Sequence, residues 1–126
     1  MPPVRPLQSW KNLTWVKAKT LAACHIFDMK EQPLIEAGTQ KILSLAAETR
    51  FAGNGIVSRT VFRSPNCRVV LFGFAAGQEL SEHTSTQHAL VQILSGECEF
   101  TLAGKPHSLK AGDLLYMPPN LPHAAC

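Results

Sequence analysis

The sequence feature that most limits the fold is the alternation, over residues 53–126, of short β-forming segments with turns that contain glycine or proline. The segments expected to be strands are residues 56–62, 68–74, 89–94, 97–102, 107–110 and 114–117. Segments this short, broken at regular intervals by turn residues, are typical of an antiparallel barrel or sandwich. A parallel sheet would need long crossover connections. We therefore predict an all-β fold in which residues 56–62 and 68–74 pair as a hairpin.

The segment before residue 53 carries no single pattern. Ile42, Leu45 and Ala46 have helical spacing, and Thr39 is a candidate cap for a helix there. Residues 41–45 fit a short strand equally well. The sequence leaves both alternatives open.

The charge is distributed unevenly along the chain. The formal net charge of +3 lies wholly in residues 1–28, which hold four basic residues and one acidic residue. Residues 29–126 hold eight basic and eight acidic residues, which cancel. The main part of the chain therefore has no basic excess, and we expect no nucleic-acid binding. No apolar run approaches the roughly 20 residues that cross a bilayer, so no membrane association is expected either.

Residues 1–35 differ from the rest in composition, since they hold both tryptophans and the excess of positive charge. We expect them to form a variable N-terminal extension or arm ahead of the barrel domain at residues 36–126. Met29 would serve as a second start, which would make the leading segment an upstream extension. Alternatively, residues 13–21 would pack as an arm on a neighbouring subunit.

The cysteines indicate the compartment. Cys24, Cys67, Cys98 and Cys126 show no CxxC spacing. The start of the chain has no apolar core of signal-peptide type, so export is not indicated. The sequence therefore favours reduced thiols in a cytoplasmic protein.

Two stretches carry the most specific pattern of the chain. In the first, Gly77 is followed after five residues by His83 and later by Gly96. The second runs from Gly112 to His123 as Gly-Asp-Leu-Leu-Tyr-Met-Pro-Pro-Asn-Leu-Pro-His. Over residues 53–126 this arrangement resembles the two motifs of the cupin superfamily, and the chain looks like a small single-domain member. The resemblance implies a small antiparallel β-barrel of jelly-roll type.

The match is incomplete at positions that matter for chemistry. Cupins that bind metal use three histidines and a glutamate, and His83 and His123 match the first and third histidines. Ser85 and Ala89 stand in the places of the second histidine and the glutamate. Two imidazoles alone seldom hold a divalent metal, because protein sites usually supply three or four ligands. A further departure is Asn120, which replaces a glycine of the second motif and tolerates the same left-handed backbone.

Strand alternation suggests which residues line the interior. On an extended strand, residues 83, 85, 87 and 89 point to one face, and His88 points to the other. The residues expected to line a pocket are His83, Ser85, Gln87, Ala89, Val91 and His123. A loop at this place would relax the parity and allow the metal set His83, His88 and His123 for one iron, nickel, manganese or zinc ion.

The resemblance also implies an incomplete barrel. Cupins usually continue past the second motif with further strands, whereas this sequence stops at Cys126. A sheet edge left without those strands needs a cover. An arm from the leading segment or a second subunit would supply it, and cupins commonly form homodimers. Truncation of a longer natural product is the rival explanation.

Three functions remain open at this point. The first is binding of a small organic molecule in the barrel, favoured by the two missing metal ligands and by apolar inward positions such as Val91, Ile93 and Phe100. The second is a metal-dependent enzyme of oxygenase or isomerase type that uses His83 and His123. The third is a structural or assembly role. The sequence does not decide whether the protein is an enzyme.

Overall fold

The computed structural model describes residues 12–20 and 32–126, and for residues 12–20 it describes the backbone alone. The strands are β1 (Asn12–Thr20), β2 (Ile56–Ser64), β3 (Cys67–Ala75), β4 (Leu80–His83), β5 (Ala89–Ser95), β6 (Glu97–Leu102), β7 (Lys105–Lys110), β8 (Leu114–Met117) and β9 (His123–Ala125). A short helix, α1 (Leu45–Glu48), precedes β2. The predicted all-β fold is confirmed. Among these residues, no helix has the length and apolar character needed to span a membrane.

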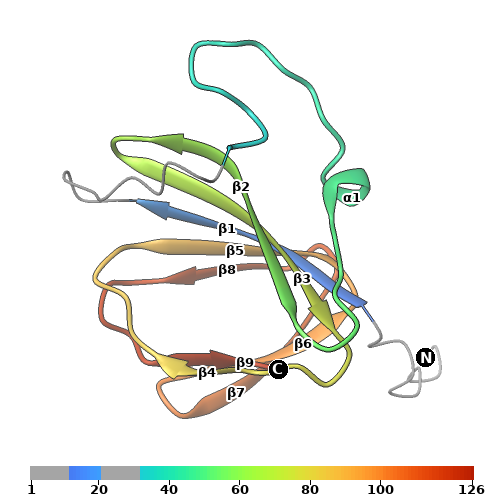
Figure 1. The fold of residues 1–126 in the computed structure, drawn as a ribbon. Coiled ribbons are helices and arrows are strands. Elements are labelled where there is room, and N and C mark those ends of the chain that lie inside the picture. The colour runs from blue at the N-terminus through green and yellow to red at the C-terminus, as the bar shows by residue number, and fades with distance from the viewer. Residues whose placement is uncertain (1–11, 21–31) are drawn as a thin grey trace.

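The strands form two antiparallel sheets that face each other (Figure 1). The five-stranded sheet has the order β2-β3-β1-β5-β8, and the four-stranded sheet has the order β4-β9-β6-β7. The predicted hairpin is confirmed, because β2 and β3 pair from Ile56 opposite Phe74 to Ser64 opposite Cys67. All of the strands expected from the sequence are present, and β1, β4 and β9 are added to them.

The leading segment contributes a strand to the larger sheet. The backbone of β1 pairs on one side with β3, where Asn12 lies opposite Ala75, and on the other with β5, where Lys19 lies opposite Ala89. This strand comes from the residues that the sequence assigned to an extension or arm. The candidate second start at Met29 lies outside the described residues.

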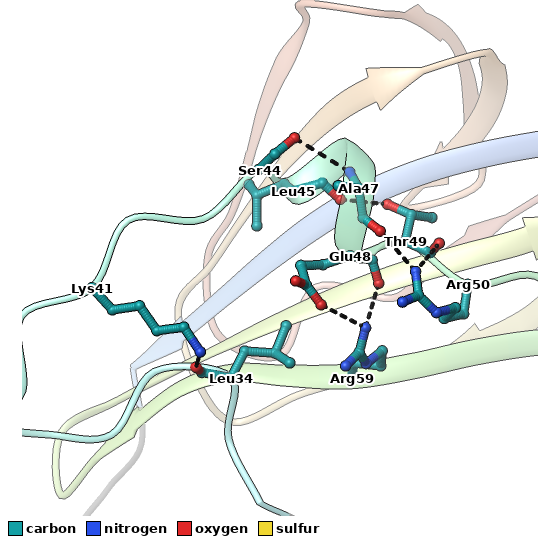
Figure 2. Close-up of polar contacts among 9 residues, drawn as sticks. All are labelled: Leu34, Lys41, Ser44, Leu45, Ala47, Glu48, Thr49, Arg50 and Arg59. Carbon is teal, nitrogen blue, oxygen red and sulfur yellow. Dashed lines mark hydrogen bonds and ion pairs between the residues drawn. The ribbon is translucent and has the colours of Figure 1, made fainter.

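Helix α1 decides between the helix and the short strand that the sequence left open before residue 53. The helix covers residues 45–48, and the Ser44 side chain caps it by accepting a hydrogen bond from the Ala47 amide at 3.3 Å. The proposed cap at Thr39 and the inclusion of Ile42 were wrong. Arg59 of β2 donates hydrogen bonds to the main-chain oxygen and the carboxylate of Glu48, which ties the helix to the outer face of the sheet (Figure 2).

The inner faces of the two sheets share one buried core. Its members, each at most 3% exposed, are Phe74, Ala89, Val91, Ile93, Cys98, Phe100, Met117 and Ala125. They come from both sheets and occupy alternate positions of β5 and β6, as expected for strands with one face inward. Burial of this apolar surface is the main favourable term for folding.

Several connections lie at one end of the barrel, which we call the loop end (Figure 1). They are the turn between β2 and β3, residues 84–88 between β4 and β5, and residues 118–122 between β8 and β9. The register agrees with this arrangement, since Ala89 at the start of β5 lies opposite Met117 at the end of β8. The ends of these strands in both sheets therefore lie at the same end of the barrel.

Gly73 allows the segment before β2 to approach the sheet. A Cβ at Gly73 would clash with the carbonyl oxygen of Arg50 and come within 3.2 Å of the Phe51 ring. Gly73 of β3 is therefore a position where the close approach of another backbone requires glycine.

We expect Gly73→Ala to lower the free energy of unfolding by about 1–3 kcal/mol, because the backbone at Arg50 has to move. Gly53→Ala is the matched control, since nothing lies within 4 Å of a Cβ at that position, and its effect should stay within about 0.5 kcal/mol. Urea unfolding of both variants measures the difference. Equal stabilities would contradict the close approach.

Candidate functional site

Two of the histidines identified in the sequence lie side by side at the loop end. His83 ends β4 and His123 begins β9, and the two residues are direct cross-strand partners. Their ring centroids are 4.2 Å apart, and the rings meet edge to face at 61°. His123 is 3% exposed, whereas His83 is half-buried. The pair therefore extends from the barrel interior towards solvent.

Backbone carbonyls orient both rings in the same way. His83 Nδ1 lies 2.8 Å from the carbonyl oxygen of Ser81, and His123 Nδ1 lies 2.9 Å from that of Leu121. A carbonyl oxygen only accepts hydrogen bonds, so each Nδ1 is the donor. In the neutral rings the lone pair is then on Nε2, which is the nitrogen able to accept a hydrogen bond or bind a metal.

The loops beside the pair hold each other in place. The Asn120 amide donates to the carbonyl oxygen of Ser85 at 2.6 Å, which links residues 118–122 to residues 84–88. Asn120 has a φ of 67°, so this asparagine adopts the left-handed conformation expected from its place in the second motif. Ser85 Oγ accepts from the Gln87 amide at 3.2 Å, and both residues are half-buried.

The six residues expected to line a pocket divide into two groups. His83, Ser85, Gln87 and His123 lie at the loop end, in the strand ends and loops described above. Ala89 and Val91 are 2% and 0% exposed and belong to the packed core. Residues 84–88 form a loop between the two sheets, yet burial alternates as expected: residues 83, 85 and 87 are half-buried, residue 89 is buried, and residues 84, 86 and 88 are exposed.

His88 does not join the other two histidines. Its side chain is exposed, and its Nδ1 lies 2.6 Å from the hydroxyl of Tyr116, with the two rings stacked at a centroid distance of 6.0 Å. Tyr116 lies on β8 directly opposite Leu90 of β5, and both residues are exposed on the outer face of the sheet. The sequence did not indicate this contact with Tyr116, because it depends on the register of β5 with β8.

The residues at the site do not fit a metal ion of the kind that many cupins hold. His83 and His123 present two nitrogen ligands, while Ser85 and Ala89 replace the other two ligands. Within the described part of the chain, no group of three or more His, Cys, Asp or Glu side chains is placed to hold a metal. Divalent metals in proteins usually need three or four ligands. We therefore derive no metal-dependent step for this chain.

The cysteines near the core are poor nucleophiles. Burial raises the pKa of the Cys98 thiol to about 12; a backbone hydrogen bond at Cys126 lowers this pKa in part, and the nearby Cys126 and Glu99 side chains raise it further. Burial also raises the pKa of Cys126. Both thiols are therefore protonated at neutral pH, and Cys98 acts as an apolar core residue.

The comparison with known proteins agrees with the motifs and the fold. The model of the cupin domain family matches residues 70–125, which contain both histidines of the pair. The chain belongs to the cupin superfamily. This cupin is also similar to the crystal structure of a conserved protein of unknown function from Streptococcus pyogenes. That match has a TM-score of 0.64 and 30% identity, and it covers 79% of this chain and 85% of the other. No curated protein matches the chain.

The orientation of the two rings gives a direct prediction. At a pH where both rings are neutral, His83 and His123 should be Nδ1–H tautomers, because each Nδ1 donates to a backbone carbonyl. Long-range ¹H–¹⁵N spectra of the imidazoles measure this, and the exposed His107 serves as the reference ring. A proton on Nε2 of either neutral ring of the pair would contradict the geometry.

Proposed function

We propose that this cupin binds a small organic molecule at the loop end of its barrel, with His83 and His123 as the polar contacts. The observation that carries the proposal is the pair of neighbouring imidazoles, both oriented by backbone carbonyls with Nε2 as the accepting nitrogen. Small-molecule sites are mostly apolar and contain a few polar groups that fix the orientation of the ligand. The pair and the adjoining core match that composition.

The chemistry of the pair indicates what kind of group it would contact. A neutral imidazole that accepts through Nε2 binds a hydroxyl or amide proton of a ligand. After protonation the same nitrogen becomes a donor and binds an oxyanion. His83 is half-buried and His123 is buried. A ligand that enters from solvent would therefore contact His83 first and His123 deeper in the barrel.

The test is a ligand screen on the ¹⁵N-labelled full chain with a library of small hydroxylated and carboxylated compounds. Compounds that bind should shift the signals of His83 and His123, and His83→Ala should weaken binding about tenfold or more because a polar contact to the ligand is lost. His107→Ala, on the exposed strand β7, is the matched control and should bind normally. A screen without binders, or binding that His83→Ala leaves unchanged, would contradict the proposal.

A specific surface also supports self-association of the protein as a homodimer. Leu90 and Tyr116 lie opposite each other on the outer face of β5 and β8, and Leu114 is the next exposed residue of β8. Their exposed fractions are 44%, 52% and 65%. The strand β8 is an edge of the five-stranded sheet. An uncharged apolar surface beside a sheet edge can pair with a second copy without charge repulsion.

We expect the full chain to be a dimer by sedimentation analysis at micromolar concentration, and Leu114→Asp to convert it to a monomer. The substitution brings two carboxylates together across a two-fold axis in an apolar contact. Ile42→Asp is the control, since Ile42 is 92% exposed and lies far from β8 in the sequence and outside both sheets. A monomeric wild type, or a dimeric Leu114→Asp variant, would exclude this surface as the interface.

A further inference from the structure

Two arginines of the β2–β3 hairpin lie on the inner face of the five-stranded sheet. Along β3, Phe74 belongs to the core and Phe72 packs against it. Alternate residues of a strand share a face, so Val70 and Arg68 continue the same inner face towards the loop end. Val70 is 6% exposed, as this position requires. Arg68 is therefore the inner-face residue of β3 at the loop end.

A β-bulge places Arg63 next to it. Thr60 lies opposite Val70, but Phe62 lies opposite Val69, so β2 has one extra residue at Val61. Such a bulge moves all later side chains of the strand to the other face. As a result, Arg63 lies directly opposite Arg68 and shares its face.

The structure holds Arg68 in a defined position. Its Nη2 donates to Thr60 Oγ1 at 3.0 Å, and Thr60 is 1% exposed. The Arg68 side chain is half-buried, and its Nε atom lies away from solvent. A guanidinium that is partly removed from water attracts an anion more strongly than one on the surface, because screening is weaker there.

The two arginines lie at the same end of the barrel as the histidine pair. Arg63 of β2 lies opposite Arg68 of β3, and Arg68 in turn lies opposite Lys19 of β1. Lys19 lies opposite Ala89 at the start of β5. Ala89 follows the loop that leaves His83. The inner face of the five-stranded sheet thus carries the two arginines and the four-stranded sheet carries the two imidazoles, both at the loop end.

We propose that the ligand of this site is an anion with a carboxylate or phosphate group, held by Arg68 and Arg63. The proposal rests on the function proposed above and adds the chemical class of the ligand. Guanidinium groups bind planar or tetrahedral oxyanions with two parallel hydrogen bonds. His83 and His123 would contact the remainder of the molecule.

Two other arginines of the chain lie outside the barrel interior. Arg59 forms an ion pair with Glu48 at 3.0 Å on the outer side, and Arg50 is exposed and donates to the main-chain oxygens of Ala47 and Thr49 (Figure 2). Arg50 is therefore a suitable control, because it carries the same charge away from the barrel interior.

The experiment compares three probes that share one ring: benzoate, phenyl phosphate and neutral benzamide. Each is titrated into the ¹⁵N-labelled full chain at low salt, and the Arg side-chain and His83 signals are followed. We expect at least one of the two anions to bind about tenfold or more tightly than benzamide, and to weaken as salt is added. Which anion binds more tightly distinguishes a carboxylate ligand from a phosphate ligand.

The variants separate a charge contact from a loss of structure. Arg68→Gln and Arg63→Gln should each weaken anion binding about tenfold, Arg68→Lys should retain part of it, and Arg50→Gln should bind as the wild type does. Thermal unfolding of each variant shows that it is folded. Equal binding of the three probes near His83, unaffected by Arg68→Gln, would overturn the anion assignment and leave the proposed binding function in place. Binding of none of the probes, together with a screen without binders, would overturn both.

Discussion

The packing of the two sheets against each other is the constraint on which the rest of this cupin depends. Phe74 of the larger sheet and Phe100 of the smaller one are each 1% exposed and belong to the same core. Side chains of this size, packed between the sheets, fix the separation and alignment of the sheets. The positions of the loops at the barrel end, and of every side chain they carry, follow from that alignment.

Backbone hydrogen bonds at the loop end position the two histidines of the site. The amide of Asn120 donates to the carbonyl of Ser85, which links the connection that follows His83 to the connection that precedes His123. Carbonyls two residues upstream then orient each imidazole. Such support leaves little freedom to the two rings, and a site that is oriented in advance loses less entropy when a ligand binds.

The site lacks two of the metal ligands that many members of its superfamily use, while the chain has the superfamily's fold. With Ser85 and Ala89 at two ligand positions, Ala89 packs into the core and supplies no carboxylate to the two imidazoles. A carboxylate there would repel an anionic ligand, whereas an alanine does not. The replacement thus agrees with the arginines at the same end of the barrel, and fold membership alone would not have indicated this.

Local periodicity allowed the sequence to determine the all-β fold, most of the strands, the β2–β3 hairpin and the inward direction of Val91, Ile93 and Phe100. The resemblance to the cupin motifs indicated that Ser85 and Ala89 stand at two metal-ligand positions. These features depend on residues that are near each other in the chain. Only the tertiary structure decided that β1 pairs between β3 and β5, that His88 turns outward to Tyr116, and that a bulge at Val61 brings Arg63 opposite Arg68. Each of these depends on the register between strands, which is set by contacts between distant residues, and a shift of one residue moves a side chain to the other face of the sheet.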